Sequence, residues 1–178
     1  GRPPNIEGKG EVTLSALVKE SLRMRPDRVV VGEIRDGNAA MDMLQAMNTG
    51  HEGSMGTVHA NGPRDCFTRI DGMVAIAGMK IDQQAVYSQI ASALDLIVYQ
   101  TRMRDGTRAV TQIAEITGME GNVISMQDVF MRPADAVGAS VPLRPAGLIP
   151  NCYQRIIDSG QTLERGMFLK DDEVGSAT

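Results

Sequence analysis

Aromatic side chains are scarce in this sequence, and its positive charges are not clustered. Its 178 residues include three Phe, three Tyr and no Trp, and the net charge is −4 without any run of Lys or Arg. Twelve Met partly replace the missing aromatic core, because the flexible thioether side chain fills irregular gaps. A nucleic-acid-binding surface would need a basic patch or stripe. We therefore expect no nucleic-acid partner.

Cysteine and long apolar runs are also nearly absent. Cys66 and Cys152 match no metal or redox spacing, which favours a reduced, cytosolic compartment. No apolar run approaches the roughly 20 residues of a membrane span, and the sequence does not begin with a signal peptide. We expect any membrane association to come through partners.

A phosphate-binding loop of the G-x-x-x-x-G-K-[ST] type is missing as well. The segment Gly8-Lys9-Gly10 has a lysine, but no glycine precedes it at the required offset, and the residue after the lysine is not Ser or Thr. No other segment fits the pattern. A site that depends on nucleotide chemistry would therefore have to draw on other motifs in this chain.

The elements that are present predict an α/β fold. Apolar periodicity predicts helices after Thr13, Asp36, Pro63 and Asp82, the first with an apolar face of Leu14, Leu17, Val18 and Leu22. Turn residues bound five predicted strands, at residues 29–34, 54–59, 94–102, 108–118 and 123–130. The order is α-β-α-β-α-α-β-β-β, an α/β sheet with an antiparallel extension. Proline breaks predict a linker over residues 131–149, followed by a helical segment at 150–169 and a frayed tail at 170–178. We expect Ile156 and Ile157 to dock that helical segment.

Glu33 is the first candidate site residue. It follows the β-branched run of residues 29–31 and Gly32, the pattern of a strand covered on both faces. Ligands of open α/β sheets bind beyond the carboxyl ends of the strands. A carboxylate there can orient or deprotonate a water, or hold Mg²⁺ through water. The alternative is a surface glutamate paired with Arg35 or Arg28.

The only two histidines flank the next predicted strand. His59 ends it, so we expect its imidazole beside Glu33, where it could hydrogen-bond a terminal phosphate or a water. Thr57 should share its face, because strand side chains alternate. The alternative is that each histidine is a polar group satisfied in a turn. A zinc site formed by His51, His59 and Cys66 matches no familiar ligand pattern.

Four motifs, in order along the chain, resemble the secretion ATPase superfamily. They are RPPNIEG at residues 2–8, LRMRPDR at 22–28, GEIR at 32–35, and the segment at 49–61 that contains both histidines. The superfamily includes motors of type II secretion, type IV pili and conjugal type IV secretion. The resemblance is strongest to the Tad/Cpa pilus-assembly branch. It extends over residues 2–130 and more weakly over 144–157.

That resemblance implies part of a RecA-like P-loop NTPase domain, with residues 1–130 as its C-terminal part. Glu33 would be the catalytic carboxylate of an atypical Walker B strand, anchored by Arg35. His59, in a histidine box, would contact the γ-phosphate side of ATP. His51 and Thr57 would support the nucleotide site. ATP and Mg²⁺ would be required, with Mg²⁺ held at Glu33 only through water.

The resemblance also implies partners and a location. Homohexamers would act in the cytoplasm, peripheral to the bacterial inner membrane, on the platform proteins of a secretion or pilus complex. The Walker A loop and the aspartate box belong before Arg2 in the superfamily. This chain alone should therefore bind ATP weakly and hydrolyse it negligibly. The alternative is a non-enzymatic oligomerisation or docking module.

Overall fold

The computed structural model describes residues 1–170, and the chain divides into two compact units at Leu94/Asp95. The predicted domain at residues 1–130 includes the first unit and three strands of the second, and its boundaries stay predictions. The predicted tail lies outside the described residues except for Lys170. None of the helices within residues 1–170 is both long enough and apolar enough to cross a membrane.

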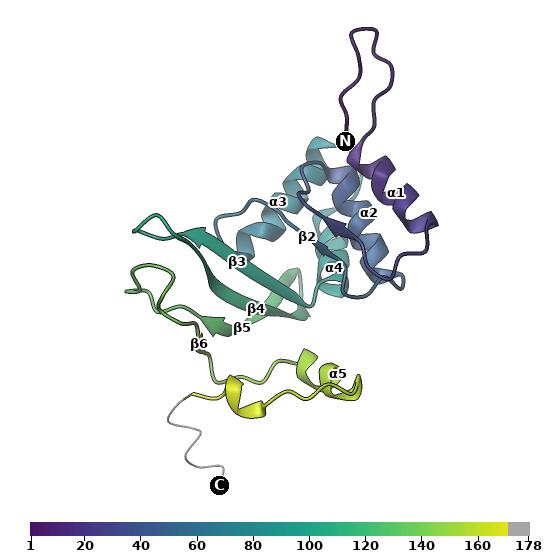
Figure 1. Cartoon of the computed structure of the whole chain (residues 1–178). Helices are drawn as coiled ribbons and strands as arrows, with labels where there is room; N and C mark the ends of the chain where they lie inside the picture. The colour runs from purple at the N-terminus through teal and green to yellow at the C-terminus, as the bar shows by residue number, and fades with distance from the viewer. Residues whose placement is uncertain (171–178) are drawn as a thin grey trace. The chain divides into compact units, whose positions relative to one another are not determined.

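Four helices make up about half of the first unit (Figure 1). Local sequence explains where they begin. Thr13, Asp36 and Asp82 each accept a hydrogen bond from a backbone N–H three residues later, as expected of N-caps, and Pro63 opens the remaining helix. The helices are α1 (Leu14–Arg23), α2 (Gly37–Asn48), α3 (Pro63–Ile76) and α4 (Gln83–Ala93).

The two strands of this unit are shorter than predicted. β1 (Val30–Val31) and β2 (Met55–Gly56) pair in parallel. The expectation that the first strand is covered on both faces is wrong, because Val30 is 67% exposed while Val31 is buried. Only the Val31 face packs on a core, which it shares with α1 and α2. Backbone hydrogen bonds continue beyond the strands, up to the bond from Ile34 N to the Thr57 carbonyl, 2.9 Å.

Helix α2 is the centre of the first unit. Met43 is 1% exposed, and Gly37 lies so close to α3 that an added Cβ would be 2.4 Å from the Met73 carbonyl oxygen. Helix α1 packs more narrowly. Val18 is buried, but Leu17, predicted to face inward, is 45% exposed, because the contact surface of α1 is limited to one stripe of the helix.

The second unit is built on a four-stranded antiparallel sheet in the order β3-β4-β5-β6. Three strands lie close to their predicted positions, and the turns between them contain Gly106 and Gly121, both with positive φ. The strands are β3 (Leu96–Arg102), β4 (Arg108–Glu120), β5 (Val123–Met131) and β6 (Arg144–Pro145). Strand β6 lies within the predicted linker and pairs with the end of β5, so that segment is not free of regular structure.

The C-terminal helical segment is also different from the prediction. It forms a short helix α5 (Cys152–Asp158) and a 3₁₀ turn η1 (Arg165–Phe168), separated by Gly160 at φ 82°. Ile156, predicted to dock the helix, is 37% exposed. Phe168 is buried instead, and its ring lies 5.6 Å from that of Phe130 and 5.9 Å from that of Tyr153. Aromatic contact therefore fixes this segment.

A buried carboxylate joins α5 to the sheet. Glu115 on β4 is 2% exposed, and it accepts hydrogen bonds from Gln127 Nε2 at 2.8 Å and from the backbone N–H groups of Asn151 and Cys152, both at 2.9 Å. Burying a charged group is unfavourable unless hydrogen bonds replace water. Three donors supply that replacement here.

Candidate functional site

Three predicted site residues meet immediately after β1. Glu33 lies between two side chains: His59 Nε2 is 3.0 Å from its Oε1, and the Arg35 guanidinium donates from Nη2 to its Oε2. The carboxylate side chain is 26% exposed, whereas that of His59 is 84% exposed. The juxtaposition of Glu33 and His59 expected from the parallel strand ends is present. So is the alternative pairing of Glu33 with Arg35.

These contacts set the ionisation of Glu33. The hydrogen bond from Arg35 is the largest influence and lowers the pKa of the Glu33 carboxyl below its ordinary 4.5. Desolvation opposes this, while the charges of Arg35 and His59 lower the pKa further. The same contact raises the pKa of Arg35. Glu33 is therefore an anion at neutral pH, available to accept a proton or a hydrogen bond.

Thr57 connects the two strand ends at the level of Glu33. Its Oγ1 donates to the Gly32 carbonyl at 2.5 Å, and its own carbonyl accepts from Ile34 N. The peptide groups on both sides of Glu33 are thus held by one residue. Because the hydroxyl is used in this way, Thr57 supports the backbone of the site in this structure.

His51 lies elsewhere. It precedes β2, whereas Glu33 follows the parallel neighbour β1, so the two residues belong to opposite ends of the strand pair. Its Nδ1 is buried and has no hydrogen-bond partner among the described residues. The structure therefore brings His59, Arg35 and Thr57 to Glu33 but leaves His51 outside this group.

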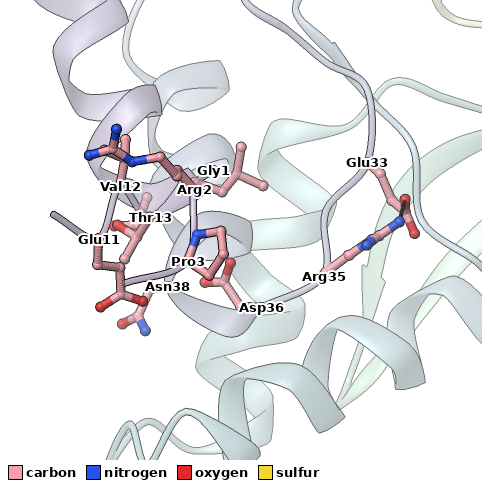
Figure 2. A pocket seen from close by; sticks show the side chains of 12 residues that line it. Gly1, Arg2, Pro3, Glu11, Val12, Thr13, Glu33, Arg35, Asp36 and Asn38 are labelled. Carbon is pink, nitrogen blue, oxygen red and sulfur yellow. Dashed lines mark hydrogen bonds and ion pairs between the residues drawn. The ribbon is translucent and has the colours of Figure 1, made fainter. Parts of the chain in front are cut away.

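A pocket of about 660 Å³ opens beside the carboxylate. Figure 2 shows Glu33 and Arg35 pointing toward one another on one side, with the start of α1 and the base of an N-terminal hairpin, where Arg2 pairs with Val12, on the other. Both acidic and basic groups line it, among them Glu11 and Arg2. The Arg2 guanidinium donates to the Gly10 carbonyl at 2.8 and 3.1 Å, which closes the hairpin.

Potential metal ligands are dispersed over the described part of the chain. Within residues 1–170, no three His, Cys, Asp or Glu side chains are grouped so that they could hold a metal ion. Burial raises the pKa of the Cys66 thiol to about 11, with a smaller contribution from Asp65. Cys66 is therefore protonated near neutral pH, which is unfavourable for a metal ligand.

Sequence reasoning missed two contacts that hold the His59 loop. Arg69 on α3 donates from Nε to the His59 carbonyl at 3.1 Å, and Asp65 accepts from Asn61 N at 2.8 Å. Asp65 could have been noticed, because an acidic residue in the first turn of a helix often binds backbone N–H groups before it. Nothing in the sequence distinguishes Arg69 from another exposed helical arginine.

Replacing Arg35 with Gln is expected to raise the pKa of Glu33 toward 4.5, because the largest cause of its lowering is lost. A carboxyl pKa that is lower in the folded than in the unfolded protein stabilises the fold at pH values above the ordinary glutamate pKa. This stabilisation is lost as the pH falls through the lowered pKa. In the Arg35→Gln variant, the free energy of unfolding should therefore no longer depend on the ionisation of Glu33. Titration of the Glu33 carboxyl ¹³C shift measures the change, with Arg28→Gln as the matched control. An unchanged Glu33 titration in Arg35→Gln would contradict the assigned cause.

Known proteins are similar to this chain over the part that carries the motifs. The family described as "Type II/IV secretion system protein" matches residues 3–139. A putative conjugal transfer protein of Mycobacterium tuberculosis is 47% identical over 122 residues, 68% of this chain and 34% of that protein. VirB11 of Agrobacterium fabrum is 38% identical over 96 residues, 53% of this chain and 28% of that protein. The chain thus spans about a third of the length of such relatives.

Among solved structures, the VirB11 ATPase of the Brucella suis type IV secretion system, in complex with sulphate, is similar to this chain. The TM-score is 0.52 at 28% identity, over 57% of this chain and 31% of the other. The similarity agrees with the expected partial RecA-like α/β fold with an antiparallel extension.

Proposed function

The chain belongs to the Type II/IV secretion system protein family, and from that membership we propose that it is the C-terminal part of a motor domain that hydrolyses ATP to drive secretion or pilus assembly. One observation carries the proposal. An ionised carboxylate, Glu33, is held at the carboxyl end of a strand with an exposed imidazole 3.0 Å away. Titratable groups placed together at such a strand end are a common form of active site.

Each side chain has a part in the proposed reaction. Glu33 orients the attacking water and accepts its proton, a contribution of general-base type. In the structure both Glu33 oxygens are engaged, so the water needs one of them to be released. His59 is the more exposed partner, and its imidazole can turn from Oε1 to the terminal phosphate of ATP. Arg35 would keep the other oxygen fixed.

ATP and Mg²⁺ follow as the proposed substrate and cofactor. The ion would neutralise phosphate charge during phosphoryl transfer. We propose that the ion is linked to Glu33 only through water. We place the Walker A loop before this segment, and the active assembly as a cytoplasmic hexamer of the Tad/Cpa pilus type at the inner-membrane platform. We propose that His51 supports the nucleotide site only from a distance.

One observation favours the alternative, a docking module without turnover. Val30 and Met55 are direct register partners, and they are 67% and 58% exposed. An exposed apolar pair on a sheet is a feature of surfaces that other chains cover.

ATP hydrolysis decides between the two. A protein extended upstream to contain the Walker A loop is expected to release phosphate from ATP in a Mg²⁺-dependent manner, whereas the 178-residue chain should not. Release can be followed with a coupled phosphate assay at saturating nucleotide. An extended protein that binds ATP but shows no turnover would reject the motor and support the docking module.

A further inference from the structure

The backbone at His59 is held by a residue of a different element. Arg69 on α3 donates from Nε to the His59 carbonyl at 3.1 Å, while the His59 imidazole contacts Glu33. We propose that Arg69 is a positioning residue: it fixes the His59 peptide so that the imidazole is presented to Glu33 and to a phosphate beside it. This assignment rests on the proposed function for its catalytic consequence only.

The loop that carries His59 is restrained at several points. Residues 57–62 connect β2 to α3, and they are held at both ends, by Thr57 to the Gly32 carbonyl and by Asn61 to Asp65. His59 lies midway, and its side chain is 84% exposed, so packing does little to fix it. The Arg69 bond therefore restrains the backbone at the middle of the loop, while the contact with Glu33 restrains the imidazole.

Helix α3 gives Arg69 a firm base. Phe67 and Ile70, its neighbours on the helix, are each 4% exposed, and Val74 is 1% exposed. Hydrogen bonds from a charged donor are stronger than neutral ones. An arginine on a packed helix can thus restrain the exposed His59 in the loop beside it.

The chemistry explains why a small displacement would matter. Rate enhancement depends on groups held within a fraction of an ångström of the reactive geometry. Loss of the Arg69 bond leaves Glu33 and Arg35 in place but frees the His59 peptide. Turnover should therefore fall more than nucleotide binding.

The test uses Arg69→Ala and Arg69→Lys, with Thr68→Ala as the control on the neighbouring exposed position of α3. His51 and His59 are the only histidines, so two sets of imidazole NMR signals report the site in the 178-residue chain. A His51→Gln variant assigns them. Arg69→Ala should shift and broaden the His59 signals and leave those of His51 unchanged. Arg69→Lys, which keeps a charged donor, should restore them in part.

In the upstream-extended protein, Arg69→Ala should lower kcat about tenfold or more with KM for ATP within about twofold. If the His59 signals of Arg69→Ala match those of Thr68→Ala, the proposal is overturned. This result does not depend on whether the protein hydrolyses ATP. If Arg69→Ala fails to fold by circular dichroism, Arg69→Gln is measured instead, and unchanged His59 signals in it would equally overturn the proposal. Lack of turnover in the unsubstituted protein would reject the motor function and leave the NMR result standing.

Discussion

Replacing Glu33 with Gln in the upstream-extended protein is expected to lower kcat for ATP hydrolysis by about 10²–10⁴-fold, the usual range for loss of a general base. The amide has nearly the same shape but cannot take up a proton near neutral pH. ATP binding should be retained, because this side chain is engaged by Arg35 and His59 and is not proposed as the main phosphate ligand. Steady-state phosphate release and binding of a fluorescent ATP analogue measure the two effects separately.

The control for this substitution is Glu120→Gln, at an exposed glutamate at the end of β4. It makes the same change of charge away from the site and should leave kcat unchanged. Equal rates for Glu33→Gln and the unsubstituted protein would remove Glu33 from the mechanism. A loss of ATP binding equal to the loss of kcat would instead assign Glu33 to nucleotide binding.

Replacing Glu115 with Ala is expected to destabilise the second unit by about 3 kcal/mol. The substitution leaves the Gln127 amide and the N–H groups of Asn151 and Cys152 without their buried acceptor. It also leaves a cavity under the start of α5, which adds to the cost. Urea denaturation measures the loss, and faster amide exchange at residues 151 and 152 would place it at α5.

Glu120→Ala is again the matched control, since the side chain lies on the same strand but is exposed. Its expected effect is within about 0.5 kcal/mol. Glu115→Gln retains one acceptor oxygen and should lie between the two. A Glu115→Ala protein with an unchanged urea midpoint would show that the three donors find water or other acceptors at no net cost.

Features set by neighbouring residues could be predicted from the sequence. The three N-caps depend on one side chain and an N–H three residues later, and all three are found where expected. The hairpin turn at Gly106 is equally local. Predicting that Glu33 lies beside His59 required one further premise, namely that adjacent parallel strands end at the same edge of a sheet. This premise holds generally for such sheets.

Features set by distant parts of the chain could not be predicted. A run of three valines cannot reveal that Val30 faces outward, because exposure depends on what packs over the strand. Glu115 looks like any glutamate of a strand until Asn151 and Cys152 are folded onto it. The anchor of the C-terminal segment was misplaced for the same reason: Phe168 finds its partner on β5, far away in sequence.

The close crossing at Gly37 has a mechanical consequence. With only 2.4 Å between a would-be Cβ and the Met73 carbonyl oxygen, α2 and α3 are in backbone contact and cannot slide past each other without separating. Helix α2 begins four residues after Glu33, and α3 carries Arg69. The loops that bear the carboxylate and the imidazole are therefore both attached to one closely packed helix pair. A displacement of the two helices would move both loops together, with the bending at glycines that end the helices, such as Gly50 and Gly78, both at positive φ.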